Sequence, residues 1–172
     1  SIDVLGPDIN ESIFKFNVND NNSIRFGMGA VKGVGQSAVK AIVEGRQTGK
    51  YKSIFDFAKR VDLRSANKKA FDSLVLAGAF DSVDDAHRAQ YFYENGDGVT
   101  FIEKAIRFGN KFQERENSLQ TSLFSDADEI KISEPSFPEC DKWSKLDQLK
   151  KEKDVVGIYI SGHPLDDYFD TL

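Results

Sequence analysis

Two glycines one residue apart constrain this chain more than any other feature of its sequence. Gly33 and Gly35 precede residues 36–43, whose apolar side chains recur at the spacing of one helical face. The pattern predicts a tight turn that opens a helix. Because glycine lacks a side chain and permits backbone angles denied to other residues, an outside group can approach the main chain closely at such a turn.

The start of this predicted helix is suited to an anion. The first amides of a helix have no partners within it, and the helix macrodipole makes that end slightly positive. Lys32 and Lys40 flank the turn, and no acidic residue occurs between Arg25 and Glu44. We therefore expect an anion to bind here, and phosphate is the anion that best fits.

The same residues also permit a plainer interpretation, a glycine-containing turn between two helices whose lysines are merely solvated. A nucleotide-binding loop fits less well, because no Gly-x-Gly-x-x-Gly follows a clear strand and no Gly-Lys-Ser/Thr loop is present. The remaining interpretation is a helix-hairpin-helix element, which holds a nucleic-acid backbone without reading its bases.

Charge is unevenly distributed along the chain, whose formal net charge is −5. Residues 32–80 contain ten Lys or Arg against four Asp or Glu, a local balance of +6. Residues 81–141 contain six against fourteen, a local balance of −8. This asymmetry indicates a basic binding surface joined to an acidic arm.

The composition indicates a soluble globular chain, long enough at 172 residues for one domain or two small ones. No apolar run is long enough to span a membrane and no secretory leader is recognisable, so a cytoplasmic location is expected. Cys140 is the single cysteine, which excludes an internal disulfide and a cysteine-based zinc site. With only His87 and His163 besides, no metal site is predicted.

A second helix-turn-helix unit follows the first, with helices expected over 54–60 and 66–77. It lacks the Gly-x-Gly and presents Arg64, Lys68 and Lys69 instead. For these side chains, a solvated basic face and phosphate contacts are equally compatible with the sequence. We interpret the two units as a pseudo-duplicated pair, in which the first supplies backbone amides and the second mainly charge and packing.

Smaller elements flank this pair. The alternating residues 13–18 and the segment 23–26 predict a β-hairpin before the glycines. Further helices are expected over 84–93, 99–117 and 143–154, and Pro164 is expected to begin a last one. In the helix over 143–154, Leu146 and Leu149 are expected to face inward. The expected fold is therefore mainly α, with a tandem helix-hairpin-helix core, a small N-terminal β-hairpin and additional helices.

A short motif follows the helix expected over 99–117. Gln120 stands three residues before the adjacent pair Leu123 and Phe124, and acidic, proline-containing sequence comes next. This is typical of an extended docking peptide, whose glutamine hydrogen-bonds while the apolar pair fills a pocket on a partner. Alternatively, Leu123 and Phe124 cover the chain's own core, and the pattern alone favours that simpler interpretation.

Taken together, several ordered segments resemble the bacterial replicative DNA polymerases of family C, the DNA polymerase III alpha subunits. The similarity covers nearly the whole chain. Each segment is modest by itself, but their order is specific. The segments are GPDIN at 6–10, VND at 18–20, FGMGAVKGVG at 26–35, AGAFD at 77–81, QTSLF at 120–124 and GIYISGHPL at 157–165.

This resemblance implies partners for the candidate site residues. Gln120, Leu123 and Phe124 match the internal peptide that binds the sliding clamp, the β subunit. The implied partners are duplex DNA, the clamp and other replicase subunits, without a membrane. Contact with the duplex backbone is implied for the hairpin, and the basic residues nearby are further candidates, which makes the DNA-binding set Lys32, Gly33, Val34, Gly35, Lys40, Arg64, Lys68 and Lys69.

The resemblance also implies how the chain is divided, since in that family this stretch runs from the end of the fingers towards an OB fold. We expect the end of the fingers with the β-hairpin, the tandem helix-hairpin-helix module, connecting helices, the clamp peptide with an acidic linker, and a C-terminal helical segment. The corresponding ranges are 1–26, 27–80, 81–117, 118–140 and 141–172.

No catalytic residue, metal site or cofactor is expected in the chain itself. A polymerase needs clustered carboxylates that hold divalent metal, Mg²⁺ being expected in the full-length enzyme, whereas the carboxylates here gather in an acidic arm beside prolines. The fragment is therefore expected to be inactive alone, although the resemblance implies that the whole protein is a DNA-directed DNA polymerase. Two alternatives stay open, a helix-hairpin-helix module of a DNA repair or recombination protein, and a module that binds an acidic protein rather than DNA.

Overall fold

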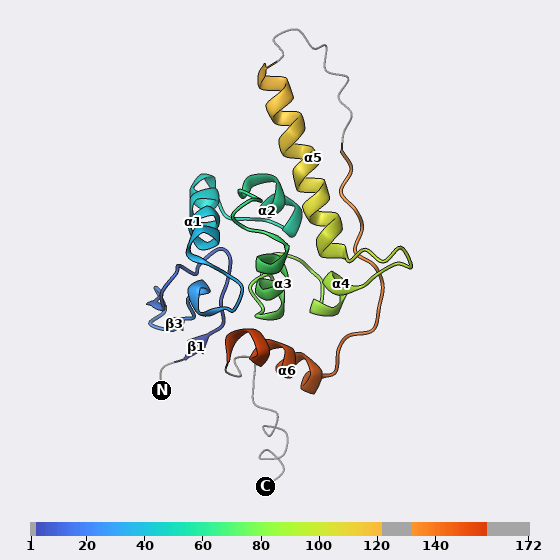
Figure 1. Cartoon of the computed structure of the whole chain (residues 1–172). Coiled ribbons are helices and arrows are strands. Elements are labelled where there is room, and N and C mark those ends of the chain that lie inside the picture. The colour runs from blue at the N-terminus through green and yellow to red at the C-terminus, as the bar shows by residue number, and fades with distance from the viewer. Residues whose placement is uncertain (1–2, 122–131, 158–172) are drawn as a thin grey trace.

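The computed structural model describes residues 3–121 and 132–157, and within them the chain is mainly helical, as expected (Figure 1). Short 3-10 turns, η1 (Met28–Ala30) and η2 (Arg46–Thr48), precede and follow the first α-helix. The six α-helices are α1 (Gln36–Gly45), α2 (Ile54–Arg60), α3 (Lys68–Leu76), α4 (Arg88–Phe92), α5 (Phe101–Thr121) and α6 (Lys145–Val156).

A small sheet lies at the N-terminal side of the molecule. Its order is β1 (Val4–Leu5), β3 (Ile24–Arg25) and β2 (Asn17–Val18), with β1 parallel and β2 antiparallel to β3. The expected hairpin of β2 and β3 is confirmed, but β2 is shorter than the predicted strand over 13–18. The earlier residues pack on η1 instead, because the carbonyls of Ile13 and Phe14 accept hydrogen bonds from the amides of Met28 and Gly29.

Aromatic side chains form the centre of the core. Phe57 of α2 contacts Phe71 of α3 and Phe80 edge to face, each with ring centroids 5.1 Å apart. This is the arrangement that the quadrupoles of aromatic rings favour. α1 contributes Ile42, which is completely buried. The core therefore joins both predicted helix-turn-helix units into a single packed body.

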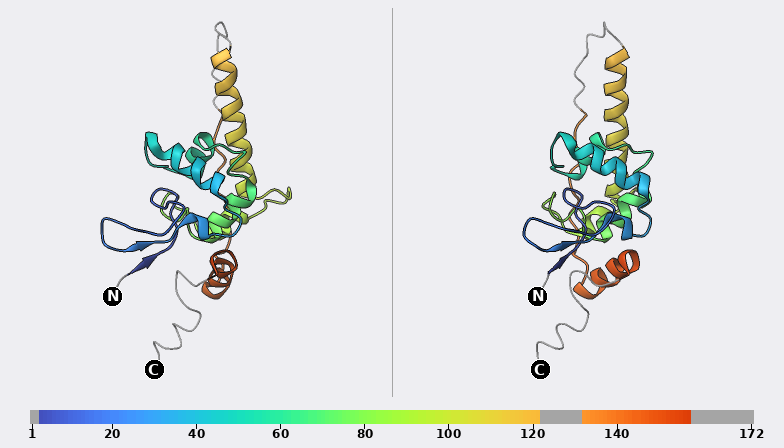
Figure 2. Two further views of the ribbon diagram at one scale, coloured as in Figure 1. Left: turned by 60° about the vertical axis from the view of Figure 1, so that its left-hand side comes forward. Right: turned by 90° about the vertical axis from the view of Figure 1, so that its left-hand side faces the viewer.

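α5 packs along α2 and then projects beyond the body, as the two further views in Figure 2 also show. Close packing is possible because Gly109 lies against the backbone of Ala58, where a Cβ atom would clash. Gln113 extends the contact by donating from Nε2 to the carbonyls of Ala58 and Val61, at 2.9 Å each. The helix expected over 99–117 is confirmed, and it continues to Thr121.

α6 lies beneath α3 in Figure 1. Ser144 caps its beginning by accepting from the amide of Asp147. Leu149 is buried as expected, but the expectation for Leu146 is wrong, since that side chain is 45 % exposed. The buried face instead includes Glu152, whose charge has a partner within the fold.

Across the ranges that the structure covers, no helix is both long and apolar enough to cross a membrane.

Candidate nucleic-acid interface

Residues 32–35, the turn before α1, are called the first hairpin below. Its two glycines, Gly33 and Gly35, have different structural roles. Gly33 has φ +87°, a conformation that residues with a side chain rarely adopt. A Cβ atom there would lie 3.0 Å from Ser73 Oγ and 3.1 Å from Cε of Lys69. Gly33 is therefore needed to form the turn and to let it pack on α3.

Gly35, in contrast, faces open space. It is the N-cap residue of α1, with φ −84° and ψ 174°, angles that any residue can adopt. Apart from its neighbours in the chain and the adjoining turn of α1, no protein atom lies within 4 Å of the position that its Cβ would take. Its missing side chain is not required by the fold, so the opening in front of α1 is accessible from outside.

The amides at this helix start have no acceptor within the described chain. The first backbone bond of α1 runs from the amide of Val39 to the carbonyl of Gly35, no side chain caps the helix, and its first turn contains no acidic residue. Among the described residues, nothing accepts from the amides of residues 35–38. Together with the positive end of the helix macrodipole, these donors form a ready site for a phosphate oxygen.

Two other amides of the first hairpin already donate to carbonyls of the protein. They are therefore not available to a phosphate, although the sequence predicted contacts from both residues. The amide of Val34 donates to the carbonyl of Val31 at 3.1 Å, and the Val34 side chain is buried in the core. The amide of Lys32 donates to the carbonyl of Val155 at 2.7 Å. Lys32 can therefore contribute to phosphate binding only through its exposed ammonium group, and Val34 only by holding the turn in shape.

The second hairpin is the turn between α2 and α3. The helix that follows it, α3, has a side-chain cap at its start. The side chain of Asn67, the N-cap of α3, accepts a hydrogen bond from the amide of Ala70 at 3.1 Å. Lys68 is paired with Asp72 at 2.7 Å and lies 3.8 Å from Glu103. The hydrogen bond to Asp72 raises the pKa of the Lys68 ammonium above its usual value. Much of the charge of Lys68 is thus balanced inside the protein.

The remaining basic candidates differ in whether a nearby carboxylate of the protein competes with phosphate for their positive charge. Lys69 makes no ion pair with a described residue, and its alkyl chain lies against Gly33, so α3 places this cation beside the first hairpin. Lys40 is 76 % exposed and lies 4.0 Å from Glu44, a weak pairing. Arg64 is exposed in the second hairpin, where its amide donates to Asp62. Lys69 therefore lies beside the first hairpin, whereas Arg64 belongs to the second hairpin.

The predicted docking peptide lies mostly outside the described residues. α5 continues through Gln120 to Thr121, so the first residue of the motif is helical rather than extended. Leu123 and Phe124 fall in the range that the structure does not describe. Their role stays a prediction.

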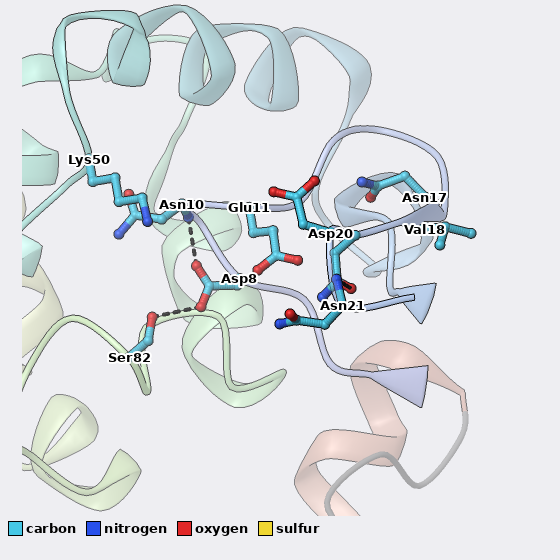
Figure 3. A pocket seen from close by; sticks show the side chains of 10 residues that line it. Asp8, Asn10, Glu11, Asn17, Val18, Asp20, Asn21, Lys50 and Ser82 are labelled. Carbon is cyan, nitrogen blue, oxygen red and sulfur yellow. Dashed lines mark hydrogen bonds between the residues drawn. The ribbon is translucent and has the colours of Figure 1, made fainter. Parts of the chain in front are cut away.

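Among the hollows near the N-terminal sheet, one is polar and another is apolar. Figure 3 shows a polar pocket of about 570 Å³ in which Asp8 accepts from the Ser82 hydroxyl and from the Asn10 amide, with Glu11 and Asp20 close by. Its carboxylates make it unsuited to a phosphate. The apolar groove, of about 630 Å³, lies between α1 and the side chains of Ile13 and Phe14.

Sequence reasoning missed the support that α6 gives to the first hairpin. The bond between the Lys32 amide and the Val155 carbonyl joins residues more than a hundred positions apart. No local pattern could have indicated it. The one available signal was Glu152, an acidic residue on the apolar side of the predicted helix.

Comparison with known proteins agrees with this geometry. Residues 1–91 match the family described as the helix-hairpin-helix motif, which is more than half of the chain. The chain is 36 % identical to the DNA polymerase III subunit alpha of Vibrio cholerae, over 98 % of this chain and 14 % of that protein. The corresponding subunit of Pseudomonas fluorescens is 37 % identical over 94 % of this chain and 15 % of the relative.

The Escherichia coli K12 subunit is 33 % identical over 98 % of this chain and 14 % of its own length. The chain thus spans about one seventh of the relatives that it matches. Both hairpins fall inside the range matched by the motif family. The chain belongs to the helix-hairpin-helix motif family, and over nearly its whole length it corresponds to one segment of the DNA polymerase III alpha subunits.

Proposed function

We propose that this chain binds the backbone of duplex DNA without sequence specificity, as the part of a cytoplasmic replicative polymerase that holds DNA behind the active site. The observation that carries the proposal is the uncapped start of α1, where no described residue accepts from the amides of residues 35–38 and the space in front of Gly35 is open. Lys32, Lys40 and Lys69 supply positive charge around it. The binding module is assigned to residues 27–80.

Contacts of this kind suit an enzyme that moves along any sequence. Backbone amides and lysines meet phosphate oxygens, which are the same at every base pair, so such contacts position the protein without specifying a site. Every lysine that neutralises a phosphate releases a counterion, and affinity then falls steeply with added salt. The relatives are named as polymerase subunits, which favours replication over repair or recombination as the setting.

The test is a titration of fluorescent duplex DNA with this chain at several salt concentrations. We expect affinity to fall linearly on a log–log plot, with a slope of about −0.9 for each phosphate that a lysine or arginine neutralises. Gly35→Leu is expected to weaken binding at least about tenfold, because its side chain covers the amides that receive the phosphate. Salt-independent affinity would favour a protein-interaction module instead, and unchanged DNA binding by Gly35→Leu would show that the phosphate does not bind at the start of α1.

We also propose that Gln120, Leu123 and Phe124 attach the polymerase to the sliding clamp. The motif begins at Gln120 in the last turn of α5, a helix whose C-terminal end projects away from the DNA-binding body (Figure 1). The test is binding of purified clamp to the chain and to the double variant Leu123→Ala, Phe124→Ala. A matched control changes Leu119 to alanine, a partly exposed apolar residue of α5 just before the motif. Equal clamp binding by all three proteins would rule out the assignment.

Polymerase activity is proposed for the whole protein and not for this segment. The relatives are DNA polymerase III alpha subunits, of which the chain spans about one seventh. A nucleotide-incorporation assay with Mg²⁺ is expected to show no synthesis by the chain alone. Robust synthesis would contradict the assignment of catalysis to another part of the polymerase.

A further inference from the structure

The hairpin that we assign to phosphate binding is held by two helices that come later in the chain. On one side, Gly33 lies against Lys69 and Ser73 of α3. On the other, the amide of Lys32 donates to the carbonyl of Val155, in the last turn of α6, at 2.7 Å. The hairpin therefore lies between α3 and the C-terminal end of α6.

This bond suits the end of a helix. The last carbonyls of a helix have no partner within it, and that end carries a partial negative charge. The amide of Lys32 satisfies one of these carbonyls. Val155 and Val156 are buried in the shared core, so the carbonyl is fixed in place by packing.

Arg88 of α4 ties the two supporting helices together. Its guanidinium donates to Glu152 of α6 at 3.1 Å and to the carbonyl of Leu76, the last residue of α3, at 3.2 Å. It also forms a 2.7 Å ion pair with Asp81. Glu152 has no exposed surface and Arg88 is 5 % exposed. A buried charge that loses its partner is strongly unfavourable, so this pair sets where α6 lies on α3.

We propose that α6 positions the DNA-binding hairpin, with Glu152 and Val155 as positioning residues that touch no DNA. The inference rests on the proposed function. The Arg88–Glu152 pair holds α6 against α3, the Val155 carbonyl then fixes the Lys32 amide, and the neighbouring turn keeps the free amides at the start of α1 in the geometry that phosphate needs. α6, which follows the proposed clamp motif in the chain, thereby affects how tightly the first hairpin binds DNA.

The test compares Glu152→Ala with Asp154→Ala in the 172-residue chain. Asp154 is exposed on the same helix, so both variants remove one negative charge, which by itself favours DNA binding. Hydrogen exchange of the Lys32 amide, followed by NMR, is expected to become at least about tenfold faster in Glu152→Ala only. Duplex-DNA affinity is expected to fall about tenfold in Glu152→Ala and to stay level or rise in Asp154→Ala.

Two features separate positioning from a general loss of structure. Affinity is expected to fall by the same factor at every salt concentration, because the misplaced amides are neutral and release no counterions. Glu152→Gln retains an acceptor for Arg88 and is expected to restore most of the exchange protection and affinity. If Glu152→Ala does not fold, Val155→Ala loosens the same contact more gently and is expected to show the same two changes.

The outcomes that overturn the inference are distinct from those that overturn DNA binding itself. The coupling is contradicted if the Lys32 amide exchanges at an unchanged rate in a folded Glu152→Ala or Val155→Ala variant. It is also contradicted if the amide exchanges faster in such a variant while the variant binds DNA as tightly as Asp154→Ala does. If Gly35→Leu binds DNA normally, the phosphate site is wrong. The exchange measurement still decides, in that case, whether α6 fixes the hairpin.

Discussion

α1 and α3 begin in comparable places, each after a short turn of a helix-turn-helix unit, yet their first amides are treated in opposite ways. α1 begins at Gly35 without any capping side chain, whereas Asn67 caps α3 from within. Around α1 the cations are exposed, while Lys68 at the start of α3 is paired with Asp72. The two units thus have one helix start without a side-chain cap and one that Asn67 caps from within the fold.

This difference explains why the two units need not share a function. A side chain that caps a helix stabilises it by only a few tenths of a kcal/mol relative to glycine, so leaving α1 uncapped at Gly35 costs the fold little. At α3 one of the equivalent amides, that of Ala70, is used for the fold by donating to the Asn67 side chain. The comparison can be tested by making each helix start resemble the other.

The largest effect is expected from Gly35→Asp, which gives α1 a cap of its own and a negative charge. The carboxylate would occupy the free amides and repel phosphate, so duplex-DNA affinity should fall about 100-fold, or roughly 3 kcal/mol. Stability should be unchanged or slightly higher, because an acidic N-cap is favourable. The measurement is DNA titration together with urea unfolding.

Asn67→Asp is the matched control, since it places the same charge at the equivalent position of α3 while keeping a cap. We expect it to change affinity by less than about threefold, consistent with exposed charges acting weakly at a distance in salt. Equal losses in both variants would show that charge, and not the open start of α1, determines binding.

The next effect distinguishes the two glycines of the first hairpin. Gly33→Ser should lower the free energy of unfolding by about 1–2 kcal/mol, because φ is +87° and Ser73 and Lys69 leave no room. Gly35→Ser should leave stability unchanged or raise it by a few tenths of a kcal/mol, since serine is a good cap. Chemical denaturation of both variants measures the difference, and similar losses would contradict these roles.

A smaller effect is expected when α3 is made to resemble α1. Asn67→Ala removes the hydrogen bond to the amide of Ala70 and should lower the free energy of unfolding by about 1 kcal/mol. Asn67→Ser keeps a cap and serves as the control. DNA affinity measured in parallel should change by less than about twofold, and a larger loss would mean that Asn67 itself contacts DNA.

The smallest effect concerns two neighbouring lysines. Lys69→Gln should reduce the magnitude of the salt slope of DNA binding by about 1, because Lys69 has no ion pair among the described residues and lies beside Gly33. Lys68→Gln should reduce it by less, because Asp72 already balances that charge. The two slopes are compared under identical buffers, and the reverse order would contradict the assignment.

Much of the helical framework followed from local patterns. Apolar spacing predicted α1, α2, α3 and α5, since each helix buries one face against the same core. β1 was missed because two residues of strand carry no periodic signal. Leu146 was placed wrongly because α6 buries Glu152 as well as apolar residues, and a charged residue that is paired inside the protein reverses the usual rule.

For the site, the sequence determined the Gly-x-Gly turn, the helix that follows it and the lysines around it, because these depend on neighbouring residues and on the backbone freedom of glycine. Only the tertiary structure decided which donors stay available. The Lys32 amide bonds to Val155 and Lys68 to Asp72, whereas the start of α1 stays open and Lys69 is brought to Gly33. The physical reason is that a donor is free or occupied according to what packs against it, and the helices that pack here come from distant parts of the chain.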